Sequence, residues 1–156
     1  MKLRPIAIAI AVACFALTPL CMAQDVTAGT WKVNAAKSKY GPSAQTKYET
    51  ITIAVNGDDV EMTLDGTDPS GNAIHTQWKG KYDGKQYPVT GDPSADSRAY
   101  KMVNGHTFEA TSMKDGKPMN TARVAYSADG KTRTVTVHGK SAHGKAVRST
   151  AVYDKE

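Results

Sequence analysis

The sequence predicts an all-β protein, a single up-and-down antiparallel β-barrel of about eight to ten strands. Two patterns indicate this fold class. After Pro42, apolar and polar residues alternate in short segments, as they do in strands that bury one face. Turn pairs such as Asn56-Gly57, Asp83-Gly84 and Asn104-Gly105 separate these segments, and two-residue hairpins favour such residues because they tolerate positive φ.

Closure of the predicted sheet follows from its number of strands. An open sheet of this size would expose two unpaired edges, which favour aggregation, and closure removes both. A two-sheet sandwich would need at least one long crossing connection. The long irregular stretches are residues 34–44 and 88–96, and each is interpreted as a cover over a barrel mouth or as a plain surface loop. We therefore expect a barrel rather than a sandwich.

Residues 1–23 have the pattern of a secretory signal peptide. Two cations, Lys2 and Arg4, precede an apolar run that ends at Leu20 and is too short for a transmembrane helix. Small residues before the bond Ala23-Gln24 predict cleavage at that bond. We therefore expect a periplasmic or secreted protein that has no integral membrane segment after cleavage.

The mature domain, residues 24–156, contains no cysteine, because Cys14 and Cys21 both lie in the signal segment. The residues before either cysteine fit a lipid-attachment motif poorly, so a lipoprotein is the less favoured alternative. Thiol nucleophiles, thiolate metal sites and disulfides are thereby excluded from the mature domain. Its size of about 130 residues corresponds to one domain.

The charge pattern argues against nucleic-acid binding. The net charge of the whole chain is +5, and it falls to +3 when the two cations of the signal segment are removed. Lysine and arginine alternate with aspartate and glutamate without forming a run, which is typical of a solvated outer face. We therefore expect no nucleic-acid partner. We also expect a monomeric protein.

Large aliphatic side chains are scarce in the mature domain, in which Leu64 is the only leucine and Phe108 the only phenylalanine. A small barrel can be filled by side chains or can hold one small ligand. Two interpretations therefore stay open: an incompletely filled barrel with a ligand cavity, or a centre that large residues plug. The inward-facing candidates for ligand contact are Trp78, Tyr82, Tyr100, Met102, Phe108 and Tyr126.

The string Gly29-Thr30-Trp31 at the start of the first mature strand resembles the Gly-x-Trp signature of lipocalins and related calycin barrels. In those barrels the tryptophan closes one end, and a basic residue from the last strand packs over it. The resemblance implies that Trp31 and Arg148 close the barrel here, where a cation over the indole would contribute roughly 0.5–2 kcal/mol. The Thr-Asp-Tyr motif and the disulfide of many lipocalins are missing from this sequence.

The mature chain as a whole is similar to a group of small exported bacterial proteins described as lipocalin-like. The strings that carry this resemblance include Tyr82-Asp83-Gly84-Lys85, Tyr87-Pro88-Val89-Thr90-Gly91 and Val152-Tyr153-Asp154-Lys155. The resemblance implies the barrel fold and export, and it brings no activity with it. The irregular segment of residues 87–93 is interpreted either as a functional loop or as a proline-stiffened crossing over the barrel end.

Patterns of catalysis and metal binding are weak in this sequence. The only side chains whose ordinary pKa lies near neutrality are the four histidines, His75, His106, His138 and His143. The last two bracket a hairpin turn and could approach each other, but all four are interpreted as solvated residues rather than metal ligands. Motifs of hydrolases and of phosphate-binding loops are missing.

Acidic pairs are predicted to be turn residues with full access to water. Asp58-Asp59 is one such pair, and Asp92 with Asp96 is another. A catalytic carboxylate pair needs burial to separate its two pKa values. We therefore expect no enzymatic activity, no metal and no cofactor.

The function that these patterns favour is binding. We expect an exported, lipocalin-like protein that holds a small, partly hydrophobic ligand among tyrosine, tryptophan and methionine side chains. The alternative is a cell-envelope interaction or structural module that uses its exterior lysines and arginines and has no small-molecule ligand. A third and weaker alternative, an enzyme such as an isomerase, would require an ionisable residue buried inside a pocket.

Overall fold

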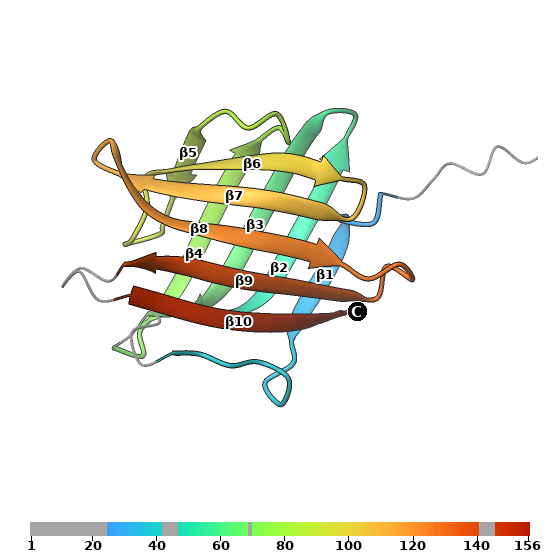
Figure 1. The fold of residues 1–156 in the computed structure, drawn as a ribbon, viewed down its shortest axis with the longest axis horizontal. Coiled ribbons are helices and arrows are strands. Elements are labelled where there is room, and N and C mark those ends of the chain that lie inside the picture. Colours follow the sequence, from blue (N-terminus) through green and yellow to red (C-terminus); the bar gives the residue numbers. More distant parts are fainter. Residues whose placement is uncertain (1–24, 42–46, 69, 141–145) are drawn as a thin grey trace, which may run out of the picture.

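Ten antiparallel strands close into a single barrel in the computed structural model, which describes residues 25–41, 47–68, 70–140 and 146–156 (Figure 1). The strands are β1 (Gly29–Val33), β2 (Lys47–Asn56), β3 (Asp59–Thr67), β4 (Ala73–Gly80), β5 (Tyr87–Thr90), β6 (Ser97–Asn104), β7 (Thr107–Lys114), β8 (Lys117–Tyr126), β9 (Thr132–Lys140) and β10 (Ala146–Lys155). Each strand pairs with its sequence neighbours, and β1 closes the ring by pairing with both β2 and β10. The predicted fold class is thereby confirmed.

The strands account for the whole regular structure of the described residues, none of which is helical. In particular, these residues form no helix long and apolar enough to span a bilayer. The predicted signal peptide, residues 1–23, lies outside the described residues.

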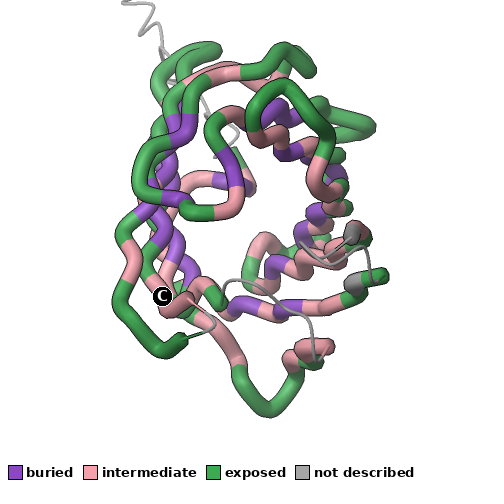
Figure 2. Tube along the Cα trace, turned by 90° about the vertical axis from the view of Figure 1, so that its left-hand side faces the viewer, coloured by how far each residue is buried: buried purple, intermediate pink, exposed green. Residues whose placement is uncertain are grey.

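The alternation of apolar and polar residues decides which side chains face the barrel interior. Along β3, Val60, Met62 and Leu64 are buried, whereas Glu61 and Asp65 are exposed. Successive side chains of a strand point to opposite faces of the sheet, so the apolar set turns inward. Figure 2, which views the barrel from one end, shows the closed ring with buried and more exposed positions alternating along the strands.

Aromatic side chains fill one end of the interior, the end that holds the turns between β2 and β3, β6 and β7, and β8 and β9. We call this set the aromatic plug: Trp31, Trp78, Tyr82, Tyr100, Phe108 and Tyr126. Their rings contact one another in tilted and edge-to-face geometry, with centroid distances from 4.6 Å for Tyr82–Phe108 to 6.2 Å for Tyr82–Tyr100. Such aromatic pairs are favourable beyond the area that they bury.

Hydrogen bonds fix the two tryptophans of the plug. Nε1 of Trp31 donates to the carbonyl oxygen of Thr27 at 2.9 Å. Nε1 of Trp78 donates to the carbonyl oxygen of Arg98, also at 2.9 Å. Both indoles are almost fully buried, so these bonds satisfy donors that would otherwise be costly to bury.

The cation over the Trp31 ring is Lys155, not Arg148. Nζ of Lys155 lies 5.1 Å from the ring centroid, and Trp31 is the register partner of Lys155 in the β1–β10 pair. Arg148 is exposed and pairs with His138 of β9. It stands seven residues before Lys155, about 23 Å away at the rise of a strand, so it cannot reach the indole.

Candidate ligand-binding cavity

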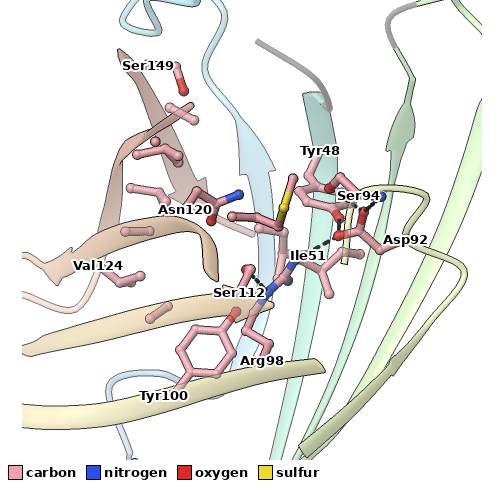
Figure 3. Close-up of a pocket in the computed structure, with 18 of the residues that line it drawn as sticks. Tyr48, Ile51, Asp92, Ser94, Arg98, Tyr100, Ser112, Asn120, Val124 and Ser149 are labelled. Carbon is pink, nitrogen blue, oxygen red and sulfur yellow. Dashed lines mark hydrogen bonds and ion pairs between the residues drawn. The ribbon is translucent and has the colours of Figure 1, made fainter. Parts of the chain in front are cut away.

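Beyond the plug, the barrel interior contains a cavity of about 140 Å³ (Figure 3). Short side chains on two neighbouring strands leave this space, since Ala110 of β7 pairs with Ala122 of β8, and Ser112 pairs with Asn120. All four residues line the cavity. Ala122 faces inward yet is only half-buried, as expected for a wall that a small molecule can touch.

The size of the cavity limits what it can hold. Apolar cavities of about 150 Å³ accept a molecule such as benzene, and about 10–15 Å³ suffices for one water. A volume of about 140 Å³ therefore suits a molecule with roughly one ring or a short chain. The walls combine aliphatic side chains such as Val124 and Val135 with polar groups from the strands and from the β5–β6 loop.

A buried ion pair crosses the polar side of the cavity (Figure 3). Nη2 of Arg98 donates to Oδ2 of Asp92 at 2.7 Å, and Nε of Arg98 donates to Oγ of Ser112 at 3.0 Å. The hydroxyl of Tyr48 donates to the same Asp92 oxygen at 2.9 Å. The other carboxylate oxygen accepts from the backbone N–H and the hydroxyl of Ser94, at 2.8 and 2.7 Å.

The position of Asp92 corrects the prediction that it is a water-exposed turn residue, because it is only 7 % exposed. The preceding Gly91 has a φ of 76°, in the left-handed region, and a Cβ there would overlap the backbone carbonyl of His75. Glycine therefore lets the chain turn tightly against β4 and direct the next side chain inward. Asp96, the other member of the predicted pair, is exposed.

The surroundings of the ion pair keep Asp92 ionised. Burial alone would raise the pKa of this carboxyl, but Arg98 and the hydrogen bonds from Ser94 and Tyr48 outweigh burial, so its pKa is lowered. Burial is also the main reason that the pKa of Tyr48 rises to about 12. The phenol is therefore a neutral donor at ordinary pH, and the carboxylate is a charged acceptor.

Lowering the pH should reduce the free energy of unfolding, because it protonates Asp92 and so removes the charge that pairs with Arg98. A carboxyl whose pKa is lower in the folded state stabilises the fold above its unfolded pKa of about 3.9, and this contribution is lost as the pH falls through the folded value. Between about pH 6 and about pH 3, the wild-type protein should therefore lose more free energy of unfolding than Asp92→Asn. Urea unfolding followed by circular dichroism measures both losses. Equal losses in the two proteins would show that the ion pair does not lower the pKa of Asp92 in the folded state. Asp96→Asn, which changes an exposed carboxyl, is the matched control.

A second arginine lines the cavity without a carboxylate partner. Arg133 of β9 is 2 % exposed and lies in register with Tyr126 and Tyr153 on its two sides. Its Nε donates to the Tyr126 hydroxyl at 3.2 Å, and its guanidinium carbon lies 5.9 and 5.4 Å from the ring centroids of Tyr126 and Tyr153. Among the described residues it forms no ion pair, and its buried Nη1 has no hydrogen-bond partner.

The six residues predicted to contact a ligand are divided between the plug and other places. Tyr100 is the member of this set that lines the cavity. In the plug, the Phe108 ring packs against those of Tyr82 and Tyr126, and the Trp78 ring packs against that of Tyr100. Met102 is 48 % exposed and lies near the end of β6. Both interpretations of the interior therefore describe part of it, since one end is plugged and the other is hollow.

The charged cavity residues were missed by sequence reasoning, although strand parity points to two of them. Arg133 shares inward parity with Val135 and Val137, and Arg98 shares it with Tyr100. An arginine on the apolar face of a strand is a signal, because buried charge is costly unless something offsets it. Asp92 leaves no such signal in the sequence, because it lies in a loop.

The described histidines lie on the surface of the barrel. His75, His106 and His138 are exposed, and Nδ1 of His75 lies 2.6 Å from an oxygen of exposed Asp65. His143 lies outside the described residues. Within the described ranges, no group of three or more histidine, aspartate or glutamate residues is arranged to hold a metal ion.

No protein-family model matches the sequence, and no curated protein matches it significantly. The fold therefore rests on the strand topology, and the candidate function rests on the cavity beyond the plug.

Proposed function

We propose that this chain is an exported, lipocalin-like binding protein that holds one small, partly hydrophobic molecule in the cavity beyond the plug. The observation that carries the proposal is the hollow end of the barrel, with aliphatic walls and a few converging polar groups. Small-molecule sites typically combine a concave apolar surface with a few polar groups that orient the ligand. Export is proposed from the signal-peptide pattern of residues 1–23.

Binding accounts for the buried ionisable groups better than catalysis does. An isomerase would need a group that exchanges protons near neutral pH. The pKa of Asp92 is lowered by Arg98 and its hydrogen bonds in spite of burial, which makes the carboxylate a weak base. Arginine keeps its proton in proteins, and the described histidines are exposed. These groups are suited to holding a ligand in place.

Filling the cavity should abolish binding of a small neutral probe. Ala122→Leu adds three carbon atoms to the cavity wall, and we expect it to weaken binding of 4-fluorobenzyl alcohol by about tenfold or more, as a loss of 1.4 kcal/mol produces. The measurement is the ¹⁹F line width of the probe as protein is titrated in. Ala125→Leu is the matched control, because Ala125 lies on the same strand outside the cavity lining and should leave binding unchanged.

Two results would contradict the proposal. Wild-type protein that leaves the ¹⁹F signal unchanged at millimolar probe would favour the envelope module without a small ligand. Equal binding by Ala122→Leu and the wild type would place the probe outside the cavity. Circular dichroism of each variant verifies that the barrel is folded.

A further inference from the structure

We propose that the ligand of this cavity carries a single carboxylate, which the guanidinium of Arg133 holds. This inference rests on the proposed binding function and specifies the class of molecule bound. It comes from the difference between the two buried arginines. The charge of Arg98 is matched by Asp92 at 2.7 Å, whereas Arg133 has no anionic partner within the described part of the chain.

The contacts of Arg133 hold it in place without neutralising it. Nε donates to the Tyr126 hydroxyl, and the rings of Tyr126 and Tyr153 lie within 6 Å of the guanidinium carbon. Aromatic rings stabilise a cation in part but carry no net charge. Because Nη1 is buried and lacks a hydrogen-bond partner among the described residues, the arginine retains an unsatisfied donor, and no described carboxylate offsets its charge.

The charge balance of the cavity favours a monoanion. The charged residues among its described lining are Arg98, Arg133 and Asp92, which together leave one positive charge. One carboxylate would bring the balance to zero, whereas a phosphate dianion would leave a buried excess of negative charge. A carboxylate also matches the planar guanidinium, because two parallel N–H groups can donate to its two oxygens.

The walls near Arg133 fit an apolar body behind that carboxylate. Val135 follows two residues along β9, and its register partners Val124 and Ala151 lie on the neighbouring strands. All three line the cavity, as does Tyr100, which adds a hydroxyl. With a volume of about 140 Å³, the cavity suits a small carboxylic acid with an aromatic ring or a short chain.

The test compares two ligands of nearly the same shape, 4-fluorobenzoate and neutral 4-fluorobenzamide, by ¹⁹F titration of the wild-type protein at neutral pH. The benzoate should bind about ten- to a hundredfold more tightly, the ratio expected when a hydrogen bond gains a charged partner. In Arg133→Met this advantage should disappear while benzamide binding stays. Arg123→Met is the control, because Arg123 is exposed on β8 and its loss changes the net charge equally.

The outcomes separate this inference from the proposed function. Equal affinities for the two ligands, or an advantage that survives in Arg133→Met, overturn the carboxylate assignment while leaving cavity binding intact. Displacement of the benzamide by inorganic phosphate but not by benzoate also overturns it. Binding of neither aromatic ligand counts against the proposed function itself. Arg133→Gln, which keeps a polar group in place, provides a second variant if Arg133→Met fails to fold.

Discussion

Replacing Arg98 with methionine should lower the free energy of unfolding by about 3–5 kcal/mol, the usual cost of removing one partner of a buried ion pair. The substitution would leave Asp92, 7 % exposed, as an uncompensated charge inside the barrel. It would also remove the donor to Ser112. Urea unfolding of the two proteins, followed by circular dichroism at neutral pH, measures the difference.

Two further variants isolate the cause of that loss. Adding Asp92→Asn to Arg98→Met removes the stranded charge, so the double variant should recover much of the lost stability. Arg133→Met removes an equally buried cation that leaves no carboxylate behind, and it should cost much less than Arg98→Met. If Arg133→Met lowered the free energy of unfolding as much as Arg98→Met does, the loss would come from removing a buried side chain and not from breaking the ion pair.

Truncating Trp78 to alanine should also lower the free energy of unfolding by about 3–5 kcal/mol, the range for large aromatic residues in a packed core. Trp78 is 1 % exposed, and its ring lies 4.8 Å from that of Tyr100 and 6.0 Å from that of Tyr87. The same urea titration measures the change. A loss below about 1 kcal/mol would show that the plug is loosely packed.

Trp78→Phe distinguishes ring packing from hydrogen bonding. Phenylalanine keeps an aromatic ring in the plug but cannot donate to the carbonyl oxygen of Arg98. We expect a smaller loss than in Trp78→Ala, of about 1–3 kcal/mol for the carbonyl left without its partner. A loss equal to that of the alanine variant would assign the whole effect to the hydrogen bond.

The barrel could be predicted from the sequence because its determinants are local. Alternation such as that of Val60, Met62 and Leu64 identifies one buried face, and turns such as Asn56-Gly57 and Asp115-Gly116 connect neighbouring strands. Gly57 and Gly116 have φ of 62° and 71°, as tight hairpin turns require. Closure then follows from the cost of free edges.

The site could be predicted only in part because it depends on register and on contacts between distant segments. The resemblance indicated a cation over Trp31, but only the β1–β10 register identifies that cation as Lys155 instead of Arg148. Asp92 enters the cavity because Gly91 turns the loop against β4, which no local pattern reveals. Arg133 could have been found by parity alone, since it faces the same way as Val135.

The central claim is that one end of the barrel is plugged, whereas the other end is hollow and binds a small molecule. The most direct test of this claim is to locate a bound probe. Nuclear magnetic resonance spectra that resolve methyl groups, recorded as 4-fluorobenzyl alcohol is added, locate the probe. The account predicts saturable shifts at Ala110, Ala122 and Val135, which line the cavity, and little change at Val60 and Met62, which lie outside its lining. Shifts confined to outward-facing residues, or spread evenly through the barrel, would contradict it.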